Sequence, residues 1–422
     1  MISQDEKIIK LANELGLQVE ESPFDSRGAH RATLDMLWLN DKGKACKDIH
    51  NISLILENDP TFSSLCFDPH ANRNLWNYER LQDRHITEIR RDLIVRYGLR
   101  VTKKDTEDAM IMVCSTRIHE PIKEYLNGLQ WDQTSRVAEL LTRAFHAETK
   151  PEWKHLIDRM SLNWFVSCVA RIFEPGCKAD TCLVLVSNKG YKKGTSFKIL
   201  AGELWFSDSD IDIGSKKGLE KLHQSGKWIW EFAEMKSFQG RSAETSKAFL
   251  TSSSDLYRPP YAHNPIEAKR RTVFCASTNN FQFLTDGPER RFYPVTLEKR
   301  IDLEYLKTNR DQIWAEAVAL YKSGAAWWFD VEELDDGTRY DWEAALARYQ
   351  TCYIVDDPWA GDVLEYLELP TTTRATNSKI FDFLSIPHGQ RNRHLSIRMG
   401  DICRSLGYDL VGSNPRYWQR KF

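Results

Sequence analysis

The feature that most constrains the fold is a change of pattern after Glu174-Pro175-Gly176, a strong helix breaker. Beyond it, short and continuously apolar runs alternate with segments of helical pattern. Such runs are typical of strands in a parallel sheet, because helices cover both faces of that kind of sheet. The alternation predicts an α/β domain with a mainly parallel sheet over residues 177–325. Strands are expected within residues 181–187, 227–235, 270–279 and 290–297, and helices within 195–203, 242–254 and 302–324.

The rest of the chain divides around this domain. Residues 1–118 have the pattern of helices and loops, and residues 119–176 that of a helical lead-in to the sheet. Residues 326–422 form a C-terminal region that turns from acidic to basic after Thr371. Two helices and a β-like ending there have the outline of a winged helix; the alternative is a solvated pair of helices. The basic residues are Arg374, Lys379, Arg391, Arg393, Arg398, Arg404, Arg416, Arg420 and Lys421.

The composition is that of a soluble globular protein. Hydrophobic residues make up 41% and charged residues 28%, and the formal charge is −2, so a nucleic-acid surface would depend on local clustering. No stretch approaches the ~18 apolar residues of a membrane span, and the charged N-terminus lacks the apolar segment of a secretory signal. The nine cysteines contain no C-x-x-C pair. We therefore expect a cytoplasmic protein with free thiols and no membrane partner.

Residues 183–203 have the layout of a phosphate-binding loop. An apolar strand leads into a turn with Gly190, and Lys193 comes immediately before a helix, placed for the β- and γ-phosphates. Backbone N–H groups of such a turn, together with the helix dipole, favour phosphate. The strict G-x-x-x-x-G-K-[ST] pattern is missed at Ser187, Lys192 and Gly194, so the alternative is a basic surface loop. The expected nucleotide-binding residues are Asn188, Lys189, Gly190, Tyr191, Lys192, Lys193, Gly194, Thr195 and Ser196.

Polar residues follow or precede the other expected strands. Glu231 ends the second apolar run and Glu234 follows, which suits one carboxylate to hold Mg²⁺ and the other to activate water. Asn279 ends the third strand, where an amide can position the same water. Arg290 and Arg291 precede the fourth strand and could reach a γ-phosphate across a subunit boundary. Each feature alone is common at a strand end, but the ordered set predicts an ATPase.

The ordered set resembles the virulence-associated protein E family, which belongs with the superfamily 3 (AAA+) helicases of phages, satellites and integrated islands. The resemblance covers about residues 119–300 and includes the segment STNNFQFLTDGPERRFYPV. The family's loop often reads G-x-Q-G-x-x-K-[ST]-[ST], which aligns Gly190 and Lys193 with its glycine and lysine, and Thr195 with its second hydroxyl. The loop departs from that pattern at Ser187, Lys189 and Gly194. Other similar segments are 119–136, 171–186, 227–235 and 255–261.

The resemblance implies ATP and Mg²⁺ as ligands, with Thr195 and Glu231 as the metal residues because Gly194 has no hydroxyl. It also implies a ring-shaped homo-oligomer, expected to be a hexamer, and single-stranded or forked DNA as the partner. A hairpin between the second and third strands would point into the pore, where cations bind phosphate and an aromatic ring stacks on a base. The expected DNA-binding residues are Arg258, Tyr261, His263, Lys269 and Arg270, and the alternative is an ordinary polar loop.

Two functions from different classes follow. The first is an ATP-driven, ring-forming DNA helicase that replicates a mobile element in a bacterial cytoplasm. The second is a DNA-binding replication initiator or regulator whose nucleotide site assembles the ring and turns over weakly. Gly194 and Lys192 favour the second, whereas Glu231, Glu234 and the arginine pair favour the first. ATP turnover stimulated by DNA separates the two.

Overall fold

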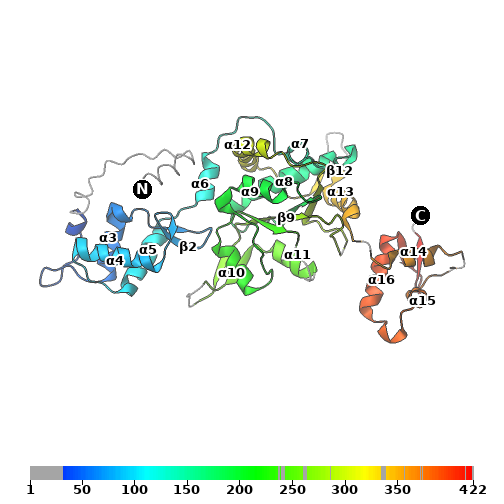
Figure 1. Cartoon of the computed structure of the whole chain (residues 1–422). Coiled ribbons are helices and arrows are strands. Elements are labelled where there is room, and N and C mark those ends of the chain that lie inside the picture. Colours follow the sequence, from blue (N-terminus) through cyan, green and yellow to red (C-terminus); the bar gives the residue numbers. More distant parts are fainter. Residues whose placement is uncertain are drawn as a thin grey trace.

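The computed structural model shows three hydrophobic cores along the chain, which we call the N-terminal, central and C-terminal units (Figure 1). The structure describes residues 32–235, 238, 243–259, 264–285, 287–333, 339–355, 357–370, 372, 374–413 and 415–420.

The central unit is built on a five-stranded sheet in which every neighbouring pair is parallel. The strands lie in the order β10-β4-β9-β6-β5. Their bounds are β4 Cys182–Val186, β5 Phe206–Ser207, β6 Ile229–Ala233, β9 Val273–Thr278 and β10 Phe292–Thr296. The expected α/β unit with a parallel sheet is therefore confirmed. Of the five strands of this sheet, the sequence analysis missed β5, because two residues are too short to show a pattern.

Helices cover both sides of this sheet. Figure 1 shows α8, α9 and α12 on one side of it and α10 and α11 on the other. The indole of Trp164 on α8 donates to the Phe274 carbonyl of β9 at 2.9 Å, so the longest core helix is tied directly to the sheet. The helices are α8 Lys154–Phe173, α9 Lys193–Ala201, α10 Lys216–Gln224, α11 Ala243–Thr251 and α12 Leu303–Lys322.

The central core extends beyond the sheet in both directions along the chain. The lead-in helices, α6 Pro121–Gly128 and α7 Leu140–Arg143, pack into it through residues such as Leu126 and Leu141. After α12, a short hairpin of β11 Val331–Glu333 and β12 Arg339–Asp341 leads to α13 Trp342–Tyr349. Trp342, Leu346 and Tyr353 belong to the same core. This core thus continues to Tyr353, whereas the sequence analysis placed the end of the ATPase domain at residue 325.

The described part of the N-terminal unit combines α-helices with a small antiparallel sheet. Its helices are α3 Ile49–Asn58, α4 Asp83–Tyr97 and α5 Lys103–Thr116, and its strands are β1 Cys66–Asp68, β2 Arg73–Trp76 and β3 Glu79–Arg80. Gly98 ends α4 in the left-handed conformation, with φ at 66°, as its position predicts. The expectation of helices and loops alone missed the sheet, because its strands are two to four residues long and carry charged side chains.

The C-terminal unit contains three helices and a hairpin. They are α14 Ala360–Glu368, α15 Asn377–Phe383, α16 Arg393–Ser405, and the antiparallel pair β13 Tyr408–Val411 and β14 Tyr417–Arg420. The two expected helices and the β-like ending are thus present. Four of the basic side chains form ion pairs within the unit: Arg391 with Asp382, Arg398 with Asp357, Arg404 with Asp401, and Arg420 with Glu368. The short 3-10 helices of the chain are Pro60–Phe62, Pro151–Trp153, Glu203–Trp205, Gln350–Tyr353 and His388–Gln390.

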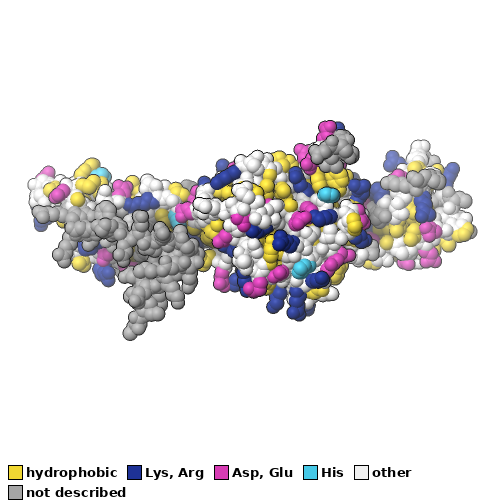
Figure 2. All heavy atoms as spheres, turned by 90° about the horizontal axis from the view of Figure 1, so that it is seen from above, with side chains coloured by type: hydrophobic (Ala, Val, Ile, Leu, Met, Phe, Trp, Pro, Cys, Tyr) yellow, Lys and Arg dark blue, Asp and Glu magenta, His cyan; other side chains and the backbone are white. Residues whose placement is uncertain are grey.

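The surface carries both signs of charge. In Figure 2, Lys and Arg side chains lie interspersed with Asp and Glu side chains on the visible face of the central unit. Within the described part of the chain, no helix combines the length and apolar character that crossing a membrane requires.

Candidate nucleotide-binding site

The candidate site lies at the carboxyl ends of three adjacent strands. Strand β9 lies between β4 and β6, and its register pairs Val186 with Thr278 and Ala233 with Ser277. The loop after β4, the turn after β6 and the residue after β9 therefore emerge side by side. In open parallel sheets, this edge is where ligands bind.

The loop after β4, residues 187–192, joins the strand to α9. Gly190 has a φ of 90°, and Lys192, at the start of the helix, has a φ of 69°. A left-handed conformation costs a non-glycine residue about 1–2 kcal/mol. Lys192 is thus strained at the position where the strict phosphate-loop pattern has glycine. Asn188, Lys189, Gly190 and Lys192 are exposed, and Tyr191 is half-buried.

The Lys193 side chain turns back into the loop and is only 8% exposed. Its ammonium donates hydrogen bonds to the Ser187 carbonyl at 2.8 Å and to the Ser187 hydroxyl at 3.0 Å. It also donates to the side-chain oxygen of Asn279 at 2.9 Å. Burial lowers the pKa of Lys193, although Glu234 and Glu231 oppose that change. With the Asn188 carbonyl at 3.5 Å, the ammonium therefore has four acceptors at the edge of the sheet that a phosphate would have to compete with.

Asn279 connects this lysine to Glu234. Its amide nitrogen donates to Glu234 Oε1 at 2.6 Å, and its backbone N–H donates to Glu234 Oε2 at 3.3 Å. Glu234 and Met235 both have a φ of 52°, so two consecutive non-glycine residues are left-handed directly after β6. Strain of this kind is concentrated at functional sites. This turn after β6 places the Glu234 carboxylate in hydrogen-bond contact with Asn279.

Glu231 lies inside β6 and is 3% exposed. Its Oε1 accepts a hydrogen bond from the Ser277 hydroxyl at 2.6 Å. Burial raises the pKa of the Glu231 carboxyl, the bond from Ser277 opposes that rise, and the negative charge of Asp208 adds to it. Its carboxylate faces Gly194 at the start of α9. The structure therefore brings together Lys193, Glu231, Glu234 and Asn279, as the sequence analysis expects.

The two candidate hydroxyls differ in accessibility. Thr195 is exposed on α9. Ser196 is fully buried and its hydroxyl donates to the Lys193 carbonyl at 2.6 Å. Ser196 was wrongly expected to contact the nucleotide, because the helix turns its side chain into the core, where its hydroxyl proton is donated to the Lys193 carbonyl.

A metal at this site would need ligands from the nucleotide. Nowhere in the described ranges do three His, Cys, Asp or Glu side chains gather in a way that could hold a metal ion. Glu231 supplies one carboxylate beside the helix entrance, and Gly194 leaves the space above it without a side chain. This donor set fits a Mg²⁺ ion that takes its remaining ligands from phosphate and water, which is how proteins usually bind Mg²⁺ with nucleotides.

The arginine pair lies at the opposite edge of the sheet. The Arg291 carbonyl accepts from the backbone N–H of Cys182, the first residue of β4. Five residues of strand, about 16 Å, separate this end of β4 from the candidate site. Arg291 pairs with Glu289 at 2.6 Å, and Arg290 pairs with Asp180 at 3.3 Å. Within one subunit, then, neither Arg290 nor Arg291 joins the other three expected catalytic residues, Glu231, Glu234 and Asn279.

The expected DNA hairpin is present as β7 Ser254–Tyr257 paired with β8 Ile266–Lys269. Arg258 and Lys269 are exposed at its two strands. Tyr261 and His263 lie outside the described residues. Arg270 was wrongly expected to bind DNA: it is 1% exposed and donates to both oxygens of Asp255, at 2.6 and 2.8 Å.

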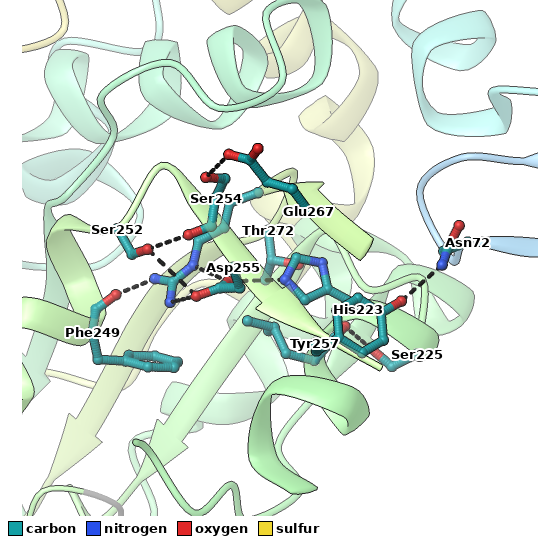
Figure 3. A network of polar contacts seen from close by, with 12 residues as sticks. Asn72, His223, Ser225, Phe249, Ser252, Ser254, Asp255, Tyr257, Glu267 and Thr272 are labelled. Carbon is teal, nitrogen blue, oxygen red and sulfur yellow. Dashed lines mark hydrogen bonds and ion pairs between the residues drawn. The ribbon is translucent and has the colours of Figure 1, made fainter. Parts of the chain in front are cut away.

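Figure 3 shows the polar network that Asp255 organises at the base of this hairpin. His223 on α10 contacts Asp255 at 2.9 Å and stacks on Tyr257 with ring centroids 5.0 Å apart. The Tyr257 hydroxyl accepts from Asn72 of the N-terminal unit at 2.8 Å. Burial would raise the pKa of Asp255, but the hydrogen bonds from His223 and Arg270 outweigh it and hold that pKa well below its usual range. Nothing in the sequence spacing of His223 points to Asp255.

Comparison with known protein families matches residues 126–341 to the virulence-associated protein E-like domain. The chain belongs to this family. The virulence-associated protein E-like domain includes the whole five-stranded sheet and every residue of the candidate site, so the resemblance inferred from the sequence is confirmed. No match is found among curated proteins.

Solved structures with similarity include three forms of the C-terminal region of NrS-1. An apo form covering residues 305–718 of that protein matches with 11% identity and a TM-score of 0.42, covering 81% of this chain and 85% of the other. Two A-form apo structures of the same region match with 13% and 14% identity and TM-scores of 0.38 and 0.36. Each of the two covers 69% of this chain and 77% of the other. With TM-scores below 0.5, these likenesses do not bear on function.

Proposed function

We propose that this chain is an ATP-driven DNA helicase or translocase that works as a ring in the replication of a phage or other mobile element. The observation that carries the proposal is the meeting of Lys193, Glu231, Glu234 and Asn279 at the carboxyl ends of three adjacent parallel strands. Membership of the virulence-associated protein E-like family supports it.

The four residues have distinct tasks in this proposal. Lys193 exchanges its contacts with Ser187 and Asn279 for the β- and γ-phosphates when ATP enters, while the backbone N–H groups of the loop surround the phosphates. Glu231 would hold a Mg²⁺ ion, which would supply neutralisation of the phosphate charge. Asn279 and Glu234 orient the attacking water, and Glu234 accepts its proton, which yields ADP and phosphate.

In a ring, a neighbouring subunit would supply the arginine that the candidate site lacks within one subunit. Arg290 and Arg291 lie about one strand length from the candidate site of their own subunit, so they could act only on a nucleotide held by a neighbour. Such an arginine stabilises the charge that develops on the γ-phosphate. ATP would then bind between subunits, and the exposed cations Arg258 and Lys269 of the β7–β8 hairpins would line the pore and contact the phosphates of single-stranded or forked DNA.

The test is ATP turnover with and without single-stranded DNA, together with unwinding of a forked duplex. We expect turnover that rises with DNA and disappears in Lys193→Ala, and unwinding that requires ATP. The absence of ATP binding by the wild-type protein, measured by calorimetry, would contradict the proposal.

A second function is favoured by one observation. Gly194 has no hydroxyl to offer a metal, and Ser196 is buried, so the loop lacks the usual metal residue. The chain would then be a DNA-binding replication initiator or regulator whose nucleotide assembles the ring with little hydrolysis. ATP binding and DNA-dependent assembly without DNA-stimulated turnover would select this function over the helicase.

A further inference from the structure

Four aromatic side chains at the carboxyl-terminal ends of α8 and α12, and just beyond α12, form a continuous row. The Phe173 and Tyr321 rings lie 5.3 Å apart between centroids. Trp327 lies 5.9 Å from the Tyr321 ring and 5.0 Å from the Trp328 ring. We call these four residues the aromatic row. Trp328, at its end, is 45% exposed, so a large apolar ring lies open to a ligand.

Hydrogen bonds hold the inner rings of the row in place. The Trp327 indole donates to the Lys178 carbonyl at 2.7 Å, and the Tyr321 hydroxyl donates to Glu174 Oε1 at 2.5 Å. The polar atoms of these two rings therefore already have partners within the protein. What the row offers a ligand is ring surface, which suits a flat, unsaturated group that can stack on it.

Cations flank the aromatic row. The Lys322 ammonium lies 5.9 Å from the centroid of the Phe173 ring. Lys178, whose carbonyl accepts from Trp327, has an exposed side chain, as has Lys322. Glu174 brings a negative charge to the same surface and offsets them in part. Exposed aromatic rings beside cations are the combination with which proteins bind single-stranded nucleic acid.

The loop 174–178 joins this surface to the β7–β8 hairpin. The Gly176 backbone N–H donates to the Arg270 carbonyl at 2.9 Å. A Cβ atom built on Gly176 would lie 3.5 Å from both Cβ and Cδ of Lys269, so the stem of that lysine lies against the loop. Two residues further on, Lys178 contacts Trp327. The exposed cation of the hairpin and the aromatic row therefore lie on either side of one short loop.

We propose that the aromatic row is a stacking platform for the bases of single-stranded DNA, continuous with the β7–β8 hairpin. This role rests on the DNA contact that the proposed function assigns to the hairpin, and it extends that contact. Lys269 binds the phosphates at the hairpin, and the strand continues across the loop to Trp328, where a base stacks. Lys178 and Lys322 bind the phosphates beside that base.

The chemistry of the surface also indicates how selective it is. Every base has a π-face, so stacking on an aromatic ring tolerates any sequence. A second copy of the chain is the other occupant that an exposed apolar ring could take. The exposed lysines on both sides of the row favour a polyanion, because a strand of DNA carries a negative charge at each nucleotide.

The first experiment compares a dT oligonucleotide with an abasic oligonucleotide of the same length, by fluorescence anisotropy with the full-length protein. Losing the platform for one stacked base weakens binding about 5- to 150-fold. Trp328→Ala should weaken dT binding by such a factor and leave abasic binding nearly unchanged, because the abasic strand has no base to stack. Trp328→Phe should keep most of the preference for dT. An undiminished preference in Trp328→Ala would overturn the inference.

Trp38→Ala is the matched control. Trp38 belongs to the N-terminal unit, is 60% exposed and packs on His50 with ring centroids 3.9 Å apart. Its substitution should change the affinity for neither oligonucleotide. Loss of the dT preference in Trp38→Ala as large as that in Trp328→Ala would contradict a specific platform.

The lysines have a different signature. Combining Lys178→Gln with Lys322→Gln should weaken dT and abasic binding alike and make the affinity less dependent on salt, since fewer counterions are released. The same salt dependence as in the wild type would contradict the phosphate contacts.

The second experiment uses the wild-type protein, so it decides the matter even if Trp328→Ala does not fold. A dT oligonucleotide containing 5-iodouracil is irradiated in the complex, and mass spectrometry locates the crosslinked peptide. The crosslink should lie within residues 321–328. Crosslinks confined to other peptides would overturn the inference. So would a Trp328→Ala protein that changes its mass in solution and keeps the dT preference, because the row would then be an interface between copies.

The hairpin and the aromatic row belong to one subunit, so DNA binding is measured without nucleotide and again with a non-hydrolysable ATP analogue. If the wild-type protein binds no single-stranded DNA, both the inference and the proposed function are wrong. If Lys269→Ala weakens DNA binding and Trp328→Ala does not, only the inference is wrong. A preference for dT that depends on Trp328, in a protein that binds no ATP, would support the inference and contradict the proposed function.

Discussion

The Lys193 ammonium and the Asn279 side-chain oxygen lie 2.9 Å apart, although 86 residues separate them in the chain. The same Asn279 amide donates to Glu234 at 2.6 Å. One amide thus holds a cation with its oxygen and a carboxylate with its nitrogen. Only an uncharged amide can do both, since its two ends are an acceptor and a donor.

This dual contact predicts different outcomes for two substitutions at position 279. Asn279→Asp adds a negative charge beside Lys193 and Glu234, so ATP affinity should fall at least tenfold, because the new carboxylate competes with phosphate for the lysine. Asn279→Ala should leave ATP affinity within about threefold but reduce turnover by a factor of about 10²–10³, as loss of one oriented donor typically does. Calorimetry and steady-state turnover measure the two effects. Equal affinities of the two variants would show that Asn279 does not govern the lysine.

Substitution of the two lysines of the loop, Lys192 and Lys193, should have very different effects on ATP affinity. Lys193→Ala removes the buried ammonium and should abolish ATP binding, whereas Lys192→Ala should weaken it only a few fold because that side chain is exposed. Lys192→Gly should also raise the free energy of unfolding by up to about 1 kcal/mol, since glycine relieves the left-handed strain. Urea denaturation and calorimetry check both effects. If Lys193→Ala retains ATP affinity and Lys192→Ala loses it, the loop has been aligned wrongly with the phosphate-loop pattern.

The arginine pair predicts complementation between subunits. Arg290→Ala should lower turnover by a factor on the order of 10³ with ATP affinity preserved. Arg290 is the stronger candidate of the pair, because its side chain is 37% exposed and that of Arg291 18%. Arg291 also donates to Thr251 at 2.8 Å, which keeps it within its own subunit. Mixing Arg290→Ala subunits with Glu234→Gln subunits should restore part of the turnover. If mixed rings form and recover no ATP turnover, Arg290 does not act on the nucleotide of a neighbouring subunit.

Two adjacent cations at the β7–β8 hairpin have different expected roles: Arg270 stabilises the fold, and Lys269 is expected to bind DNA. Arg270→Ala leaves Asp255 buried without its main partner and should lower the free energy of unfolding by about 3–5 kcal/mol. Lys269→Ala, the neighbouring and exposed cation, should leave stability unchanged while weakening single-stranded DNA binding and its salt dependence. Urea denaturation and DNA titration at two salt concentrations measure these effects. A stable Arg270→Ala variant would contradict the structural role.

Stability should fall in mild acid because of His70. Burial lowers the pKa of His70 from 6.5 to about 4, with Arg271 and His223 acting in the same direction and Asp68 opposing it. Between these two values the unfolded chain binds a proton that the folded protein does not. The free energy of unfolding should therefore decrease as pH falls from 6.5 to about 4, by at most about 1.4 kcal/mol per pH unit. His70→Asn should flatten this slope. If the free energy of unfolding of His70→Asn, measured by urea denaturation at several pH values, falls with pH as steeply as that of the wild type, other groups cause the pH dependence.

Sequence patterns predicted the sheet and the site because both depend on local order along the chain. Continuous apolar runs separated by helices require a parallel sheet, and in such a sheet the residues after each strand emerge at one edge. Lys193, Glu234 and Asn279 each follow a strand and Glu231 lies within one, so their meeting is a consequence of topology. The short β1–β3 sheet could not be predicted in this way, because strands of two to four residues show no periodicity.

Side-chain environments were decided by the tertiary structure. Arg270 and Lys269 are adjacent cations, yet Arg270, directly after β8, is buried against Asp255, whereas Lys269, the last residue of β8, is exposed. Ser196 and Thr195 are adjacent hydroxyls, and the helix buries one of them, because its successive residues point in different directions. The glycine at position 194 departs from the phosphate-loop pattern when the sequence is considered alone. Its explanation is the Glu231 carboxylate, which a separate strand brings within van der Waals contact of that position.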